Sequence, residues 1–196
     1  MVNDFAAQVA GLQHLTSGLI GERVIVRTWR PEDAPALYAA IDESRDHLAR
    51  WMPWVHHHQG ETDTADYVAR YAEINAQGDI ALGIFSAEDG RTVLGATGFH
   101  DIDWTIPALE IGYWASIRAE GNGYITEAIR LLTEFAIAEL SANRMVICCD
   151  PGNARSRRVA ERVGYVLEGQ LRNAGRAPDG SLRDTLVFSR IPESAH

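Results

Sequence analysis

The sequence contains no lysine, so all 18 of its basic side chains are arginines, and none of its own side chains offers an ε-amine for acylation. Cysteine is nearly absent as well, with only Cys148 and Cys149, which are adjacent in an apolar run. Such a pair indicates buried thiols in a reducing compartment, and it argues against a disulfide framework or a metal site.

Long apolar runs and an excess of positive charge are also missing. No run approaches the roughly 20 residues that a membrane-spanning helix needs, and the N-terminal stretch lacks the basic residues that open a secretory signal. We therefore expect a cytoplasmic protein without a membrane partner. A net charge of −9 argues against a nucleic-acid partner and allows a basic acceptor, such as a cationic peptide or an amine.

The chain is long enough for one domain with a sizeable core, since it has 196 residues, of which 46% are hydrophobic and 23% charged. Residues 1–20 have only a weak helical pattern, and we expect a loosely attached extension there. Beyond residue 20, the spacing of hydrophobic residues predicts a chain that contains both strands and helices. Strands are expected near 21–29, 80–85, 92–100, 109–116, 144–149, 165–171 and 182–189, and helices near 31–41, 44–51, 62–76, 125–140 and 154–163.

The most informative stretch is 109–140, which reads as a strand, a loop with two glycines and an amphipathic helix. Gly121 and Gly123 let the backbone turn with positive φ. The first N–H groups of the helix have no partner within it, so the loop is suited to hold a phosphate. A nucleotide P-loop needs Gly-Lys-Ser/Thr, and a dinucleotide fingerprint needs a small residue where Thr126 stands, so neither fits. The alternative is a tight strand-to-helix turn.

A second pattern lies in 153–169, where Asn153, Ser156, Gly164 and Tyr165 are spaced as N-x-x-S-x7-G-[FY]. This signature and the Arg-x-x-Gly-x-Gly loop both resemble the GCN5-related N-acetyltransferases (GNAT). The segment HLARWMPWV and the tail GQLRNAGRAPDGSLRDTLVFSRI are similar to the RimJ/RimL branch, whose members acetylate the N-termini of ribosomal proteins. The resemblance runs from about residue 21 to about residue 191, nearly the whole chain.

The resemblance implies an α/β (α+β mixed) fold in which helices flank a mixed, mostly antiparallel sheet of six to seven strands, splayed between the fourth and fifth. It also implies that 1–20 precede a single acetyltransferase domain over 21–191. The co-substrate would be acetyl-CoA, with no metal, and the acceptor a primary amine. We expect the amine to be the α-amine of a protein N-terminus. The alternatives are a small amine (an aminoglycoside, polyamine or amino-acid derivative) or a protein that binds acyl-CoA without turnover.

Roles carried over by the resemblance fall on two groups of residues. A backbone N–H near Trp114 or Ala115 would polarise the thioester carbonyl, and Ser156 would protonate the leaving thiolate unless it is an ordinary helix-start hydroxyl. Asn153 would bind the pantetheine chain or only cap its helix. The residues expected to bind the cofactor are Trp114, Ala115, Ser116, Arg118, Gly121, Asn122, Gly123, Tyr124, Asn153 and Ser156.

The acceptor amine must lose a proton before it attacks. Glu110 is the first candidate for the base, acting through a water on the strand face opposite to Tyr113, with Asp101 and His100 as alternates and a purely structural carboxylate as the other reading. Trp51 and Trp54 line the acceptor cleft or merely cap the core, and His100 is expected beside them.

Three remaining features carry weaker expectations. Glu120 stands where the family usually has Arg or Gln, and we expect its side chain to point to solvent or to complement the helix N-terminus. The run of histidines 56–58 is expected to be a solvated loop and not a metal site. Exposed aromatic residues, among them Trp51, Trp54 and Trp104, give a possible contact for a homodimer.

Overall fold

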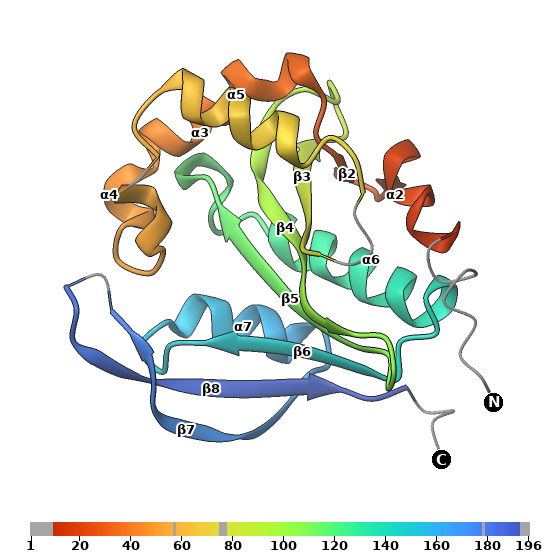
Figure 1. The fold of residues 1–196 in the computed structure, drawn as a ribbon, viewed down its shortest axis with the longest axis vertical. Coiled ribbons are helices and arrows are strands. Elements are labelled where there is room, and N and C mark those ends of the chain that lie inside the picture. The colour runs from red at the N-terminus through yellow and green to blue at the C-terminus, as the bar shows by residue number, and fades with distance from the viewer. Residues whose placement is uncertain (1–9, 57, 75–77, 178, 193–196) are drawn as a thin grey trace.

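The computed structural model describes residues 10–56, 58–74, 78–177 and 179–192, which form one sheet with helices on both faces (Figure 1). The sheet has eight strands in the order β1-β2-β3-β4-β5-β6-β8-β7, and among its neighbouring pairs only β5 and β6 are parallel. The mixed, mostly antiparallel sheet is thus confirmed. The strands are β1 (Leu19–Ile20), β2 (Val24–Thr28), β3 (Ile80–Ser86), β4 (Val93–Asp103), β5 (Ala108–Ala115), β6 (Arg144–Cys149), β7 (Val166–Arg176) and β8 (Leu182–Arg190).

The helices divide between the two faces according to their apolar stripes. One core cluster joins α3 and α5 to the sheet, and the other joins α6 and α7 to its opposite face (Figure 1). Within the described residues, no helix combines the length and the apolar character that crossing a membrane requires. The helices are α2 (His14–Ser17), α3 (Ala34–Glu43), α4 (Arg45–Leu48), α5 (Glu61–Arg70), α6 (Tyr124–Glu139) and α7 (Ala154–Arg162), with short 3-10 helices η1 (Pro31–Asp33), η2 (Pro53–His56) and η3 (Ile117–Ala119).

The segment before residue 21 is more firmly packed than the sequence predicts. Leu12 and Leu15 have no exposed surface and belong to the same core cluster as α6. The two residues of β1 also pair with β2, which gives the sheet one strand more than expected. The described part of this segment is therefore not loosely attached, because its leucines complete the core. The domain boundary near residue 21 stays a prediction.

The central strands separate where the resemblance implies that they should. β5 and β6 pair only from Ala108 to Glu110, whereas β4 accompanies β5 as far as Ala115 and β8 accompanies β6 as far as Cys149. Beyond Glu110 the two strands run apart (Figure 1). The splay lies between the fifth and sixth strands rather than the fourth and fifth, since β1 shifts the count by one.

Backbone N–H groups along β5 point alternately to β4 and into the opening between β5 and β6. The N–H of Ser116 bonds to Leu94 O on β4, and hydrogen-bonded pairs alternate with non-hydrogen-bonded pairs in an antiparallel ladder. The N–H groups of Trp114 and Gly112 therefore point to β4, whereas those of Ala115 and Tyr113 point into the opening. Buried backbone donors need an acceptor, so the opening is suited to hold an extended chain with amide groups.

A buried ion pair fixes the start of α3. Arg27 and Asp33 are each 5% exposed, and two guanidinium nitrogens donate to the carboxylate at 2.7 and 2.9 Å. The same carboxylate accepts the Arg30 N–H at 2.8 Å, and the guanidinium lies 3.8 Å from the centre of the Phe85 ring. This contact holds η1 and α3 against the sheet, on the face where the candidate site lies.

Candidate active site

The glycine loop has the geometry that its sequence predicts. Gly121 and Gly123 have φ of 76° and 81°, in the left-handed region. The N–H of Glu127 makes the first bond into α6, to Gly123 O, so the N–H groups before it remain for another acceptor. Arg23 lies beside the loop, where it donates to Asn122 O at 2.8 Å and sits 5.3 Å from the centre of the Tyr124 ring.

Glu120 does not point to solvent, so that prediction is wrong. Its side chain is only 16% exposed, and its carboxylate lies 2.8 Å from His47 Nε2 and accepts a bond from Arg155 Nη1 at 2.7 Å. One partner comes from α4 and the other from α7, so the carboxylate joins both helices to the loop. Arg118, in contrast, is 82% exposed, and its Nε lies 2.6 Å from Glu43 Oε2.

The second motif forms the first turn of α7. Asn153 Oδ1 accepts the Ser156 N–H at 3.1 Å, which shows the helix cap directly. Ser156 Oγ lies 2.9 Å from the Tyr113 hydroxyl, which also donates to Ser156 O at 3.0 Å. Burial raises the pKa of Tyr113 well above its usual range, so the phenol stays protonated. Tyr113 was missed as a functional residue, although its alternation with Glu110 placed it on the face that α7 covers.

The three candidate bases lie together where β5 and β6 begin to separate. Glu110 Oε1 is 3.8 Å from His100 Nε2, and His100 Nδ1 is 3.1 Å from Asp101 Oδ2. Asp101 has a positive φ of 48° at an irregularity in the β4–β5 register, which turns its side chain toward His100. Ligand-type atoms of these three residues all lie within 4.8 Å of one another.

Both cysteines are free, and Cys148 contacts Glu110. Its thiol donates to Glu110 Oε2 over 3.4 Å. Burial, followed by the negative charge of Glu110, raises the pKa of the Cys148 thiol to about 12, so it remains a neutral donor. The Glu110 side chain is 20% exposed, and the thiol and the imidazole together orient its carboxylate in a partly dry setting.

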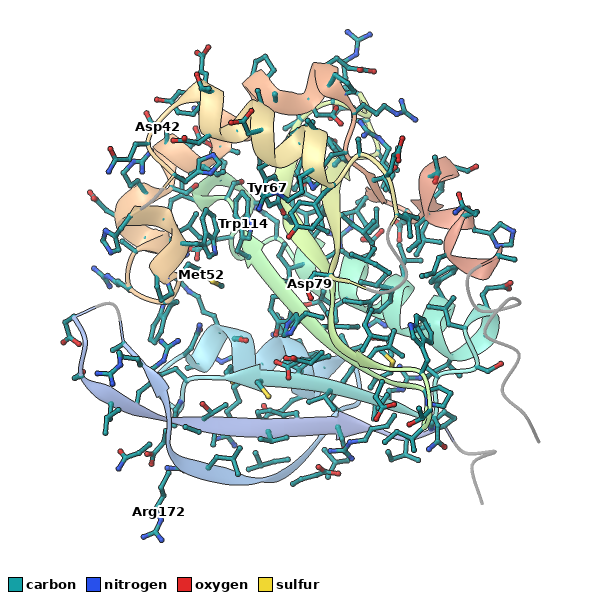
Figure 2. The ribbon with its side chains drawn as sticks, viewed as in Figure 1. Asp42, Met52, Tyr67, Asp79, Trp114 and Arg172 are labelled. Carbon is teal, nitrogen blue, oxygen red and sulfur yellow. The ribbon has the colours of Figure 1, made fainter. Side chains whose placement is uncertain are left out.

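A cavity of about 520 Å³ opens on this face, between the strands β4 and β5 and the elements α3, η2 and α5. Trp54 and Trp114 face each other in it with ring centres 6.1 Å apart. Figure 2 shows Met52, Tyr67 and Trp114 arranged around this space. Its lining comprises Leu37, Ile41, Met52, Trp54, His58, Tyr67, Tyr71, Asp79, Ile80, Ala81, Ala96, Thr97, Gly98, Phe99, His100, Asp101, Gly112, Tyr113 and Trp114.

Other predicted residues lie in or around this cavity. Trp51 is not part of the cavity lining, and its ring lies 3.7 Å from where a Cβ on Gly152 would be. Trp114, expected to bind the cofactor, has its side chain in the lining of this cavity. Ser116 is buried, and its N–H already bonds to β4. His57 lies outside the described residues, while His58 Nε2 contacts Thr64 Oγ1 at 2.5 Å.

Comparison with known proteins places this arrangement among acetyltransferases. Residues 23–166 match the model of the acetyltransferase (GNAT) domain. The YdaF protein of Bacillus subtilis (strain 168) is 33% identical over 177 residues, which are 88% of this chain and 93% of that protein. The ribosomal-protein-serine acetyltransferase of Escherichia coli (strain K12) is 29% identical over 158 residues, 81% of this chain and 87% of that enzyme.

Solved structures agree in fold. RimL, a ribosomal L7/L12 alpha-N-protein acetyltransferase in complex with coenzyme A, superposes with a TM-score of 0.81 at 22% identity, covering 90% of this chain and 98% of that one. The microcin C7 self-immunity acetyltransferase MccE, in complex with acetyl-CoA and AMP, gives 0.80 at 24% identity, covering 88% and 94%.

Proposed function

The chain belongs to the acetyltransferase (GNAT) domain family, and from that premise we propose that it transfers the acetyl group of acetyl-CoA to the α-amine of a protein N-terminus. The observation that carries the proposal is the opening between β5 and β6. The glycine loop lies at the wide end of this opening, Glu110 lies where the two strands begin to separate, and Ser156 lies beside it. These are the places for a pyrophosphate, a base and a proton donor.

The loop fits a pyrophosphate on its own chemistry. Two glycines in the left-handed region bring backbone N–H groups to the start of α6, where the helix dipole favours an anion. Arg23 brings a guanidinium beside the loop, where it pairs with Glu127 at 2.9 Å, and the exposed Arg118 guanidinium can exchange Glu43 for a phosphate. Because the Arg155 guanidinium pairs with Glu120 and the His47 ring contacts it, that acid no longer argues for a protein that has lost its activity.

The proton transfers follow from the side chains at the foot of the opening. Glu110 takes a proton from the ammonium group through a water, and the amine nitrogen attacks the thioester carbonyl carbon. The Ala115 or Tyr113 N–H stabilises the oxyanion. When the carbon–sulfur bond breaks, the acceptor nitrogen loses its second proton to water, and Ser156 Oγ–H protonates the thiolate and regains a proton from water. Tyr113 holds that hydroxyl in place from 2.9 Å. Asn153 keeps the turn that presents Ser156.

An α-amine suits this weak base better than a lysine does. Its ordinary pKa is about 7.7–8.0, against about 10.4 for lysine, and each unit corresponds to about 1.36 kcal/mol. Removing the proton from a lysine therefore costs roughly 3 kcal/mol more. The relatives named for ribosomal proteins support a protein N-terminus, and a ribosomal substrate implies a cytoplasmic location. A homodimer stays a prediction, and Trp54 does not support it because its ring packs inside the cavity.

The test is a thiol-release assay with acetyl-CoA. The acceptors are N-terminal peptides of ribosomal proteins and the same peptides blocked at the α-amine but bearing a free lysine. The proposal predicts thiol release with the free α-amine and none after blocking. Release from both peptides would overturn the α-amine assignment. Release from a polyamine or aminoglycoside alone would identify a small-molecule acetyltransferase instead.

A further inference from the structure

The acceptor cavity has a floor without side chains at its centre. Three cross-strand pairs of β4 and β5 face it, namely Ala96–Trp114, Gly98–Gly112 and His100–Glu110. The middle pair consists of two glycines, which add no side chain between the indole at one end and the ionisable groups at the other, and the edge of the His100 ring lies beside Gly112. Four residues of extended chain span about 13 Å, which is room for a large side chain lying along the floor.

The two glycines are present for different reasons. A Cβ on Gly98 would lie 2.0 Å from Ile80 O, so the close approach of β3 requires glycine there. A Cβ on Gly112 would meet only the His100 ring, at 3.0 and 3.3 Å, and Gly112 is not among the residues with positive φ. The fold therefore does not demand glycine at this position. What glycine supplies is room for the His100 ring, which lies against it, and a floor without a side chain of its own at this position.

The walls above this floor are aromatic and uncharged. The ring centres of Tyr67 and Tyr71 are 4.9 Å apart, and those of Trp54 and Trp114 are 6.1 Å apart, with the two indoles tilted against each other. Burial raises the pKa of Tyr67 to about 12, and burial lowers the pKa of His58, so neither is charged at neutral pH. An apolar wall of this kind favours an apolar occupant.

Charge is confined to the other end of the cavity. Asp79 and Asp101 line it there, and Glu110 adjoins it across the His100 imidazole. Carboxylates at one end suit the positive charge of an ammonium group, and the aromatic end suits an apolar group attached to it. An acceptor oriented in this way has its amine at Glu110 and its bulk over Gly112.

We propose that this slot, defined by Trp54, Tyr67, Tyr71, Gly112 and Trp114, takes the side chain of the acceptor's first residue and selects a large apolar or aromatic one. The inference rests on the proposed function, because it assumes that the acceptor is an α-amine. A first residue such as serine or alanine leaves the slot unfilled and gains none of its contacts. The slot thereby sets the substrate class: N-termini that begin with Phe, Leu or another bulky apolar residue.

The first experiment compares peptides that differ only in their first residue. With acetyl-CoA as donor, kcat/KM for peptides starting with Phe or Leu is expected to exceed that for Ser or Ala by at least about tenfold, the scale of discrimination in an apolar pocket. Equal values, or higher values for Ser and Ala, would overturn the proposal.

Variants then locate the preference. Gly112→Ala places a methyl group on the floor and is expected to lower the Phe-to-Ala ratio of kcat/KM by about tenfold. Tyr71→Ala removes part of the wall and lowers the ratio in the same direction. Tyr38→Ala is the matched control, because this half-buried tyrosine of α3 does not line the cavity, and its ratio should equal that of the parent. A ratio unchanged by both cavity variants would contradict the slot.

Phenylalaninamide and alaninamide separate this inference from the proposed function. If no peptide reacts but phenylalaninamide is acetylated at least about tenfold faster than alaninamide, the slot stands and the protein acceptor is wrong. If peptides react without preference for the first residue, the protein acceptor stands and the slot is wrong. If neither peptides nor amides react, both are refuted.

Discussion

Replacing Glu110 with Gln tests the base at the foot of the splay. Glutamine keeps the size of the side chain and an acceptor oxygen for the Cys148 thiol, which donates over 3.4 Å. It loses the negative charge and the ability to take a proton. The change therefore removes the basic group and leaves a side chain of the same size in the same place. That side chain is 20% exposed and lies between the thiol and the His100 ring.

The expected loss depends on pH because the acceptor also titrates. For an α-amine with a pKa of about 7.8, about one molecule in seven is neutral at pH 7 and more than about nine in ten at pH 9. A positioned base contributes about 10²-fold or more. The variant reacts only with the neutral amine, whose fraction is about sevenfold larger at pH 9 than at pH 7. Its kcat/KM is therefore expected to fall about 100-fold at pH 7 and only about 15-fold at pH 9.

The assay is thiol release from acetyl-CoA with a saturable peptide acceptor, measured from pH 6.5 to about 9.5 for the parent and the variant. Glu134→Gln, an exposed carboxylate on α6, is the control and should follow the parent. A loss that is the same at every pH would refute the reasoning, since it would mean that Glu110 holds its neighbours in place without removing a proton. The base would then be sought at His100 or Asp101.

Three further substitutions test the proton donor Ser156, the buried Arg27–Asp33 ion pair and the pH dependence of stability at Glu168. Ser156→Ala should lower kcat by about 10²-fold with little change in KM, because the hydroxyl acts on the leaving thiolate; an unchanged kcat would remove its role. Asp33→Ala leaves the Arg27 guanidinium buried without its partner, so urea unfolding should show a loss of about 3–5 kcal/mol, and a loss below about 1 kcal/mol would contradict the pairing. Bonds from Arg144 lower the pKa of Glu168 to about 2. A depressed carboxylate pKa stabilises the fold above the ordinary value and loses that effect as pH falls. Glu168→Gln should therefore be less stable than the parent near pH 6, by under about 1 kcal/mol because the carboxylate is 41% exposed, and equal to it near pH 2; a constant difference would exclude the ion pair as its cause.

Local sequence pattern was enough to predict the elements that we propose bind the cofactor. Gly121 and Gly123 predicted a left-handed turn, because a strand led into it and an amphipathic helix followed. Asn153 and Ser156 predicted a capped helix start for the same reason, since side chain and backbone are only three residues apart. The splay after Glu110 came from the family resemblance, and the structure confirms it with a one-strand shift in numbering.

Contacts between segments that are distant in the sequence cannot be predicted from local patterns. Arg23 reaches Asn122 across 99 residues of sequence, and Glu120 finds His47 on one helix and Arg155 on another. No local rule places these partners beside the loop, so the sequence alone predicts that an isolated acid points to solvent. The packing of Leu12 and Leu15 is not predicted either, because the helical turns that hold them are too short to show a clear period and they pack in the same core cluster as α6.

The acceptor cavity shows the same limit for a different reason. The sequence predicts Trp54 in the cleft, but it indicates Tyr67 and Tyr71 only as part of a helix and Gly112 only as part of a strand. Their common role depends on the register that sets Gly98 opposite Gly112. A register is fixed by the whole sheet, and it becomes visible only once the strands are assembled.

The most direct test of the central claim is to map the acetyl group by tandem mass spectrometry. The acceptor is a peptide with both a free α-amine and a lysine, incubated with acetyl-CoA and the parent protein at pH 7. The account predicts acetylation of the α-nitrogen alone. Acetyl found on the lysine ε-nitrogen, or on neither nitrogen while a small amine is acetylated, would contradict it.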